Sequence, residues 1–177
     1  MTTQIRTFSR SAILSAKNLI ISGMFLTGLI LGVLSIDIYR DTVIPVNQVI
    51  VSIACSSVFG LLILFLMFRS EKLWYLVAVS ASFFGGVVMF VTLFVNREFR
   101  HSERILGQFD IVKRGSMSRS KSGCRQPLIG ISFYGQDKEL VMYCQDELSA
   151  ATAQKVQLVY AEGFFGYPYI LSKKLLD

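Results

Sequence analysis

Three long apolar segments without an ionisable side chain fill the first half of the sequence, and they limit the folds open to this chain. They cover residues 18–36, 47–68 and 73–95. At about 1.5 Å per residue, an α-helix of each length can cross a hydrocarbon core of roughly 30 Å. A helix on the surface of a water-soluble protein needs a polar face, which these segments lack. We therefore predict three transmembrane helices, and a content of 53% hydrophobic and 17% charged residues agrees with this.

The second half of the sequence has the period of β-strands. From Ile105 onward apolar and polar residues alternate, and we expect a hairpin that turns at Gln136 and Asp137 and pairs Phe133 with Leu140. The predicted fold class is membrane α+β: three transmembrane helices followed by a small antiparallel β-sheet or partly open β-barrel domain. The predicted parts are a cytoplasmic N-terminal tail (1–17), a three-helix transmembrane bundle (18–96), a helical linker (97–106) and a small β domain (107–177) with a short helix at 146–154.

Basic residues in the short flanking segments set the expected orientation, because lysine and arginine are retained in the cytoplasm. Five of them lie on one side of the bundle, and only Arg40 lies on the other. We therefore expect the N-terminus in the cytoplasm and, after three crossings, the C-terminal domain outside it. Arg97, Arg100 and Arg104 directly follow the third segment and favour the opposite orientation, but long domains translocate largely regardless of charge. The five residues on the cytoplasmic side are Arg6, Arg10, Lys17, Arg69 and Lys72.

Two cysteines flank the predicted hairpin. Cys124 and Cys144 lie in the extramembrane part of the chain, whereas Cys55 lies inside the second apolar segment. A disulfide between Cys124 and Cys144 would stabilise the small domain by roughly 3 kcal/mol and would require an oxidising compartment. The alternative is that they are two unrelated buried thiols.

Two groups of basic residues are candidates for contact with lipid headgroups or with an acidic partner. The first follows the third apolar segment, and the second lies in the serine- and glycine-rich segment 113–125. The alternatives are a helix end whose side chains extend to the interface and an exposed hairpin tip. For the aromatic segment 163–169 the two alternatives are packing in the core and an apolar surface patch for a partner or the bilayer. The two basic groups are Arg97, Arg100 and Arg104, then Lys113, Arg114, Arg119, Lys121 and Arg125.

Small residues recur at helical spacing in each apolar segment. Such rows let helix backbones approach closely in lipid, where packing drives association. They serve contacts within the chain, between chains, or both. The rows are Gly28 and Gly32, then Ser52, Ser56 and Gly60, then Ala78, Ser82 and Gly86.

The residue patterns of the common catalytic and cofactor sites do not occur in the sequence. The one histidine, His101, has no cysteine or carboxylate at metal-ligand spacing, and no phosphate-binding glycine loop is found. The apolar segments hold no aspartate, glutamate, lysine, arginine or histidine for a proton or ion pathway. We expect neither an enzyme nor a resident cofactor. The expected partners are the lipid bilayer and a membrane protein or second copy of the chain, not nucleic acid.

The strand rhythm and glycine placement of the segments 107–115, 127–143 and 155–170, after a short helical bundle, resemble a loose group of bacterial inner-membrane proteins of uncharacterised function. These have a few N-terminal spans and a small C-terminal extracytoplasmic β domain. The resemblance carries over no site residues. Two functions are expected: a non-catalytic accessory or scaffold subunit of an inner-membrane complex, or an immunity-type protein that neutralises a toxin at the membrane.

Overall fold

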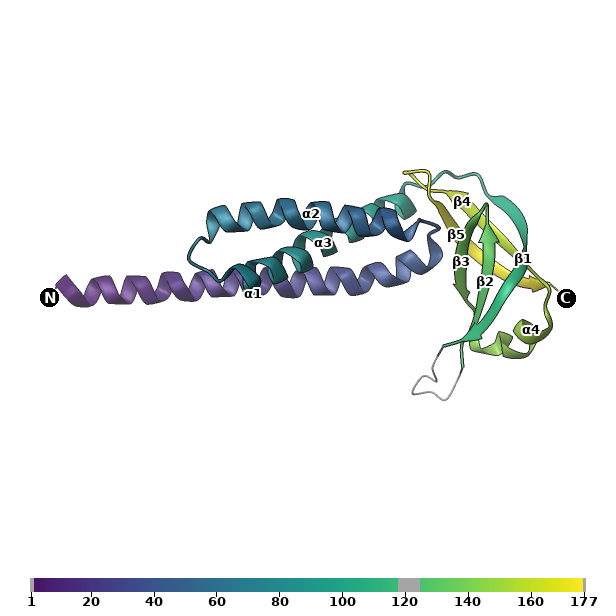
Figure 1. Cartoon of the computed structure of the whole chain (residues 1–177), viewed down its shortest axis with the longest axis horizontal. Helices are drawn as coiled ribbons and strands as arrows, with labels where there is room; N and C mark the ends of the chain where they lie inside the picture. The colour runs from purple at the N-terminus through teal and green to yellow at the C-terminus, as the bar shows by residue number, and fades with distance from the viewer. Residues whose placement is uncertain (1, 118–124, 177) are drawn as a thin grey trace. The chain divides into compact units, whose positions relative to one another are not determined.

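The computed structural model describes residues 2–117 and 125–176, with side chains from Ala16 onward. Its first half consists of the helices α1 (Thr2–Asp41), α2 (Val46–Met67) and α3 (Leu73–Glu98) (Figure 1). Within the described residues three helical segments are long and apolar enough to cross a membrane: Ala16–Asp41, Val46–Met67 and Leu73–Glu98. Large apolar side chains lie exposed along all three helices, as a lipid environment allows.

Helices α1 and α3 cross with their backbones in contact. A Cβ atom added to Gly28 would overlap the backbone of Ser82, and one added to Gly86 would overlap the carbonyl oxygen of Gly28. The Ser82 hydroxyl also donates a hydrogen bond of 3.0 Å to the carbonyl oxygen of Phe25. The absence of a side chain at Gly28 and Gly86 therefore makes this crossing possible.

Helices α2 and α3 pack through a different set of small residues. Gly60 accommodates the ring of Phe84. Gly85 lies against Ile53, although it was not among the small residues predicted from the sequence. The Ser80 hydroxyl donates a hydrogen bond of 2.6 Å to the carbonyl oxygen of Ser57 on α2. The other predicted residues contribute less: Gly32 has open space where a side chain would lie, Ser52 is exposed, Ser56 bonds to its own helix, and Ala78 is half-buried.

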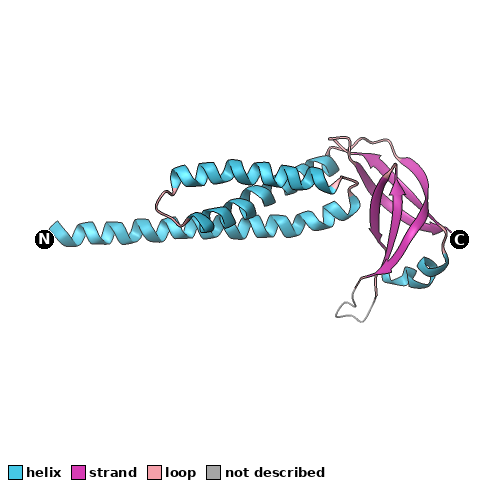
Figure 2. Cartoon of the chain, viewed as in Figure 1, coloured by secondary structure: helices cyan, strands magenta, loops and turns pink. Residues whose placement is uncertain are grey.

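The second half of the described chain is a five-stranded antiparallel sheet that curls into a half-barrel (Figure 2). The strand order is β3-β2-β1-β4-β5, so β3 and β5 are the edge strands. A 3₁₀ turn (Cys144–Asp146) and α4 (Glu147–Thr152) connect β3 to β4. This architecture confirms the predicted fold class. The strands are β1 (Ile105–Ser116), β2 (Pro127–Phe133), β3 (Gln136–Val141), β4 (Lys155–Glu162) and β5 (Pro168–Leu176).

Alternate residues of the strands fill one core on the inner face of the sheet, as the period of two requires. Phe133 stacks on Phe109 at 4.8 Å between ring centroids and meets Tyr160 edge-on at 5.1 Å. Val43, from the connection between α1 and α2, belongs to the same core. The buried set is Val43, Ile129, Ile131, Phe133, Leu140, Met142, Ala150, Val156, Leu158, Tyr160 and Ile170.

The hairpin of β2 and β3 turns at Tyr134 and Gly135, so the predicted turn at Gln136 and Asp137 was wrong. Phe133 pairs with Gln136 instead of Leu140. Both turn residues have positive φ, 47° and 82°, as a two-residue type I′ turn requires, and glycine adopts this conformation without strain. The register differs from the prediction by an even number of residues, so the expected face of each strand is retained.

Helix α3 ends at Glu98, whereas the sequence predicted a helical linker as far as residue 106. Residues 99–104 form no helix, and β1 begins at Ile105. The last helical carbonyls bond elsewhere: that of Asn96 accepts from the Phe164 N–H at 3.3 Å, and that of Arg97 accepts from the Arg100 side chain at 2.6 Å. These bonds replace the next helical turn and end the helix.

We expect Gly28→Val to destabilise the helical bundle by about 1–3 kcal/mol, because a branched side chain there overlaps the backbone of α3. The matched control is Gly32→Val, one helical turn along the same helix, where the described chain leaves the space open. The measurement is the free energy of unfolding in mixed micelles, titrated with a denaturing detergent. Equal losses for the two variants would contradict the crossing.

Candidate functional site

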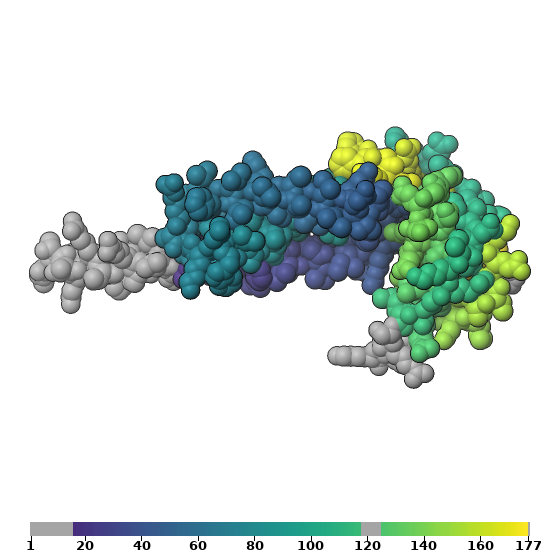
Figure 3. All heavy atoms as spheres, viewed as in Figure 1, coloured from purple at the N-terminus to yellow at the C-terminus, as the bar shows by residue number. Residues whose placement is uncertain are grey.

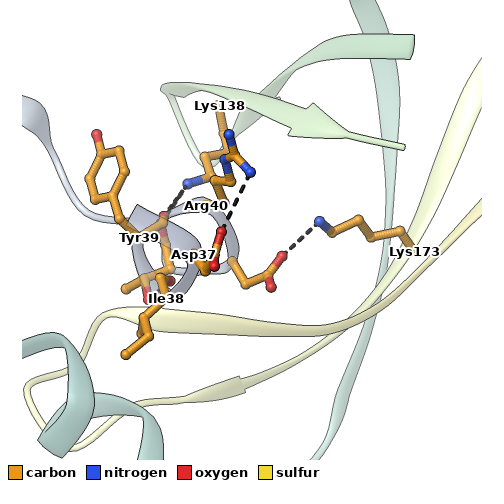
Figure 4. Close-up of polar contacts among 8 residues, drawn as sticks. Asp37, Ile38, Tyr39, Arg40, Lys138 and Lys173 are labelled. Atoms are coloured by element: carbon orange, nitrogen blue, oxygen red, sulfur yellow. Dashed lines mark hydrogen bonds and ion pairs between the residues drawn. The ribbon is translucent and has the colours of Figure 1, made fainter. Parts of the chain in front are cut away.

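The end of α1 lies inside the β domain. Residues 36–46 and 92–177 form one compact unit, separate from the rest of the helices. The last turn of α1 therefore meets the edge strands β3 and β5, and its polar side chains form the cluster in Figure 4. This cluster is the candidate site.

Lys138 of β3 caps the C-terminal end of α1. It pairs with buried Ile131, two residues before the buried Leu140, so its stem lies on the inner face of the sheet. Its ammonium group donates hydrogen bonds to the carbonyl oxygens of Tyr39 at 3.0 Å and Thr42 at 2.6 Å, and it lies 5.0 Å from the Tyr39 ring centroid (Figure 4). Carbonyls at a helix C-terminus have no intrahelical donor, and a cation is favourable there.

A second lysine, from the opposite edge strand, holds the same helix end. Lys173 of β5 lies 2.7 Å from Asp41, and both side chains are partly buried. Burial lowers the pKa of Lys138 to about 8; the charge of Asp41 opposes this shift, and that of Lys173 adds to it. The two edge strands of the half-barrel are thus joined through the end of α1.

The residues that follow α1 continue along the edge of β5. Thr42 forms an isolated antiparallel bridge with Tyr169, and the Val43 N–H donates to the carbonyl oxygen of Pro168 at 2.8 Å. The Thr42 hydroxyl also bonds back to the carbonyl oxygen of Ile38 at 2.8 Å. These bonds bring the short connection between α1 and α2 into the β domain.

A cavity of about 340 Å³ lies beside this cluster. Its walls come from the end of α1, the end of β3 and the middle of β5, so it occupies the gap between the two edge strands. Charged residues of both signs, a tyrosine and apolar residues line it together, which suits binding of a partner with mixed chemistry. The lining residues are Asp37, Arg40, Asp41, Gln126, Val141, Met142, Tyr143, Ile170, Leu171, Ser172 and Lys173.

The end of α3 is held by a buried amide. Asn96 is fully buried; its side-chain amide donates to the carbonyl oxygen of Tyr167 at 2.9 Å and accepts from the Phe165 N–H at 3.0 Å. Gly163 packs directly on this side chain, and a Cβ atom there would overlap it. Asn96 therefore fixes the turn between β4 and β5 to the end of α3.

Four of the predicted basic residues that the structure describes contact other groups of the fold. Arg97 pairs with Glu98 at 3.1 Å, and the Arg100 guanidinium lies 5.7 Å from the Tyr169 ring centroid. On the sheet, Lys113 pairs with Glu139 at 3.3 Å, and Arg114 donates to the carbonyl oxygen of Ala153 at 2.5 Å. Arg104 and Arg125 are exposed, whereas Arg119 and Lys121 lie outside the described residues.

The cysteines are placed only in part. Cys144 is disulfide-bonded, and Cys55 is free and exposed on α2. Cys124 lies outside the described residues, so its pairing with Cys144 stays a prediction.

Sequence analysis missed the three residues that hold the helix ends. Lys138 lies on the same side of its strand as the apolar Leu140, and Asn96 is the first polar residue after the third apolar segment. Both positions signal a polar group with a specific partner, although neither names that partner. Lys173 carried no distinguishing signal, because it resembles any lysine on an edge strand.

Among the residues that the structure covers, no group of three or more histidine, cysteine or acidic side chains is placed to hold a metal ion. His101 lies outside the cavity; its backbone N–H bonds to the carbonyl oxygen of Glu162 at 2.8 Å. Comparison with protein-family models, with curated proteins and with solved structures finds no match to this chain.

We expect the stability of the β domain to increase with pH between about 8 and 9.5, because unfolded lysine keeps its proton to a higher pH than Lys138 does in the fold. The unfolded state then binds more protons, which gives a slope of up to about 1.4 kcal/mol per pH unit. Burial raises the pKa of Tyr160 to about 12, so its opposite contribution begins only above this window.

Lys138→Met removes this pH dependence, whereas Lys174→Met, on the exposed side of β5, retains it. The measurement is denaturant unfolding of the full chain in mild detergent at several pH values, with the circular dichroism of the tyrosines as the signal. The same slope in Lys138→Met and the wild type would contradict the burial of this amine.

We expect Asn96→Ala to cost about 2–3 kcal/mol, because the Tyr167 carbonyl and the Phe165 N–H lose their partner in a buried place. Asn96→Asp removes the donor as well and faces the Tyr167 carbonyl with an anion, so it should be at least as damaging. The control is Asn18→Ala, at an exposed position of α1, with an effect within about 0.5 kcal/mol. Thermal unfolding in mild detergent measures all three.

Proposed function

We propose that this chain is a non-catalytic accessory or scaffold subunit of a protein complex in a bacterial inner membrane. Its helices pack in the bilayer, and its β domain contacts a protein partner outside the cytoplasm. The observation that carries this proposal is the cavity between the edge strands β3 and β5, which presents Met142 and Ile170 beside the charges of Asp37 and Lys173. An extended segment of a partner can bind such a gap through strand-edge hydrogen bonds and side-chain contacts.

The proposed orientation rests on charge and on cysteine chemistry. Lys17 pairs with Glu71 at 2.8 Å, so the start of the first span and the basic turn 69–72 lie at the same end of the bundle, which we assign to the cytoplasm. Cys144 is disulfide-bonded, and disulfides persist in oxidising compartments. Both observations favour an extracytoplasmic β domain.

We expect a photo-cross-linking amino acid at Tyr143 to capture one discrete membrane or extracytoplasmic protein in living cells. Tyr143 lines the cavity and is 71% exposed, so the probe reaches an occupant without removing a core residue. The matched control position is Leu148 on α4, which is 86% exposed and does not line the cavity. The captured protein should also copurify in mild detergent with the wild-type chain, which carries no photo-cross-linking amino acid.

The identity of the adduct separates the two functions. A stable membrane-complex subunit supports the accessory role, whereas one secreted effector supports the immunity-type role. No discrete adduct at Tyr143, or the same adducts at Tyr143 and Leu148, would contradict a partner in the cavity.

A further inference from the structure

Three phenylalanines form an exposed aromatic cluster in the β domain. Phe99, Phe164 and Phe165 are 65%, 60% and 49% exposed, whereas Phe133, the phenylalanine of the core, is 2% exposed. Phe99 meets Phe164 edge-on at 6.3 Å between centroids, and Phe164 meets Phe165 at 5.1 Å. The turn that carries two of them lies at the surface in Figure 3, where it is yellow. We call these three residues the aromatic tip.

The aromatic tip is fixed at the level where α3 leaves the bilayer. The apolar run of α3 ends at Val95, and Phe164 and Phe165 bond through their backbone N–H groups to Asn96, the next residue. Phe99 follows one helical turn later, and its N–H still donates to the Val95 carbonyl at 3.1 Å. At about 1.5 Å per residue, Phe99 lies only about 6 Å beyond the apolar run.

Basic side chains accompany the tip at the same level. Arg97 lies in the last turn of α3, where it pairs with Glu98 and stays 40% exposed, and Arg100 follows two residues after the helix, with its guanidinium over the Tyr169 ring. Aromatic rings favour the headgroup region of a bilayer, and arginine there is attracted to anionic phosphates. The hydrophobic length of α3 places both groups in that region.

We propose that the aromatic tip is a lipid-binding surface that inserts into the headgroup boundary of the bilayer that α3 spans, with Arg97 and Arg100 on the lipid phosphates. Its occupant is the lipid of this same bilayer. The tip thereby anchors the β4–β5 end of the β domain at the membrane surface. This surface is separate from the cavity, since the two share no lining residue.

The test uses single-tryptophan variants of the full chain. Trp74 is the one native tryptophan, so Trp74→Phe provides the background for Phe164→Trp. The matched control is Leu148→Trp on α4. Helix α4 precedes β4 in the chain, whereas Phe164 follows β4. The eight residues of β4 separate its two ends by roughly 25 Å.

Each variant is reconstituted in vesicles of phosphatidylcholine and phosphatidylglycerol, with iodide on both sides or with a nitroxide near the lipid headgroup. We expect Phe164→Trp to be quenched by the nitroxide and to be several-fold less sensitive to iodide than Leu148→Trp. Adding Arg97→Gln should increase its iodide sensitivity in these vesicles but not in phosphatidylcholine alone.

Three results would overturn the proposal. The first is equal iodide sensitivity of the two tryptophans without nitroxide quenching of Phe164→Trp. The second is protection from both quenchers, which means that protein covers the tip. The third is protection that disappears as the protein is diluted in lipid, which means that a second copy covers it. Native-like circular dichroism of each variant shows that the fold is retained.

Discussion

The carbonyl groups at the ends of α1 and α3 need new hydrogen-bond donors where the helices stop, and the β domain supplies them. Lys138 donates to two carbonyls at the end of α1, and the Phe164 N–H donates to the carbonyl of Asn96 at the end of α3. An unpaired buried carbonyl costs about 1–3 kcal/mol, so these bonds determine where each helix ends. They also make the helix ends part of the β domain rather than linkers to it.

This arrangement constrains how the chain crosses the bilayer. Val43, which connects α1 to α2, is buried in the core of the β domain, and Thr42 pairs with Tyr169. The connection and the domain must therefore lie on the same side of the membrane. Such a placement requires an even number of crossings between them, which α2 and α3 provide. Contacts within one folded unit thus agree with the three spans inferred from hydropathy alone.

The parts that sequence analysis predicted are those that depend on composition and period. Charge-free runs specify the helices, and alternation specifies which side of each strand is buried, because both patterns reflect transfer out of water. The hairpin register depended instead on the backbone conformation of Gly135, and the role of Gly85, which lies against Ile53, depended on tertiary packing. Lys138 and Asn96 act on partners about 70 to 100 residues away, which no local pattern encodes.

The two proposed surfaces divide the β domain between lipid and protein. The aromatic tip combines two residues of the turn after β4 with Phe99, the residue after α3, whereas the cavity lies where β3 and β5 flank the end of α1. An occupant of the cavity meets the ion pair of Lys173 and Asp41, which is already partly buried. Excluding the remaining water strengthens that pair but also removes its hydration, so an occupant that adds hydrogen bonds to either side chain is favoured over an apolar one. In this proposal the occupant of the cavity is therefore a polar, extended segment, and that of the tip is the lipid interface.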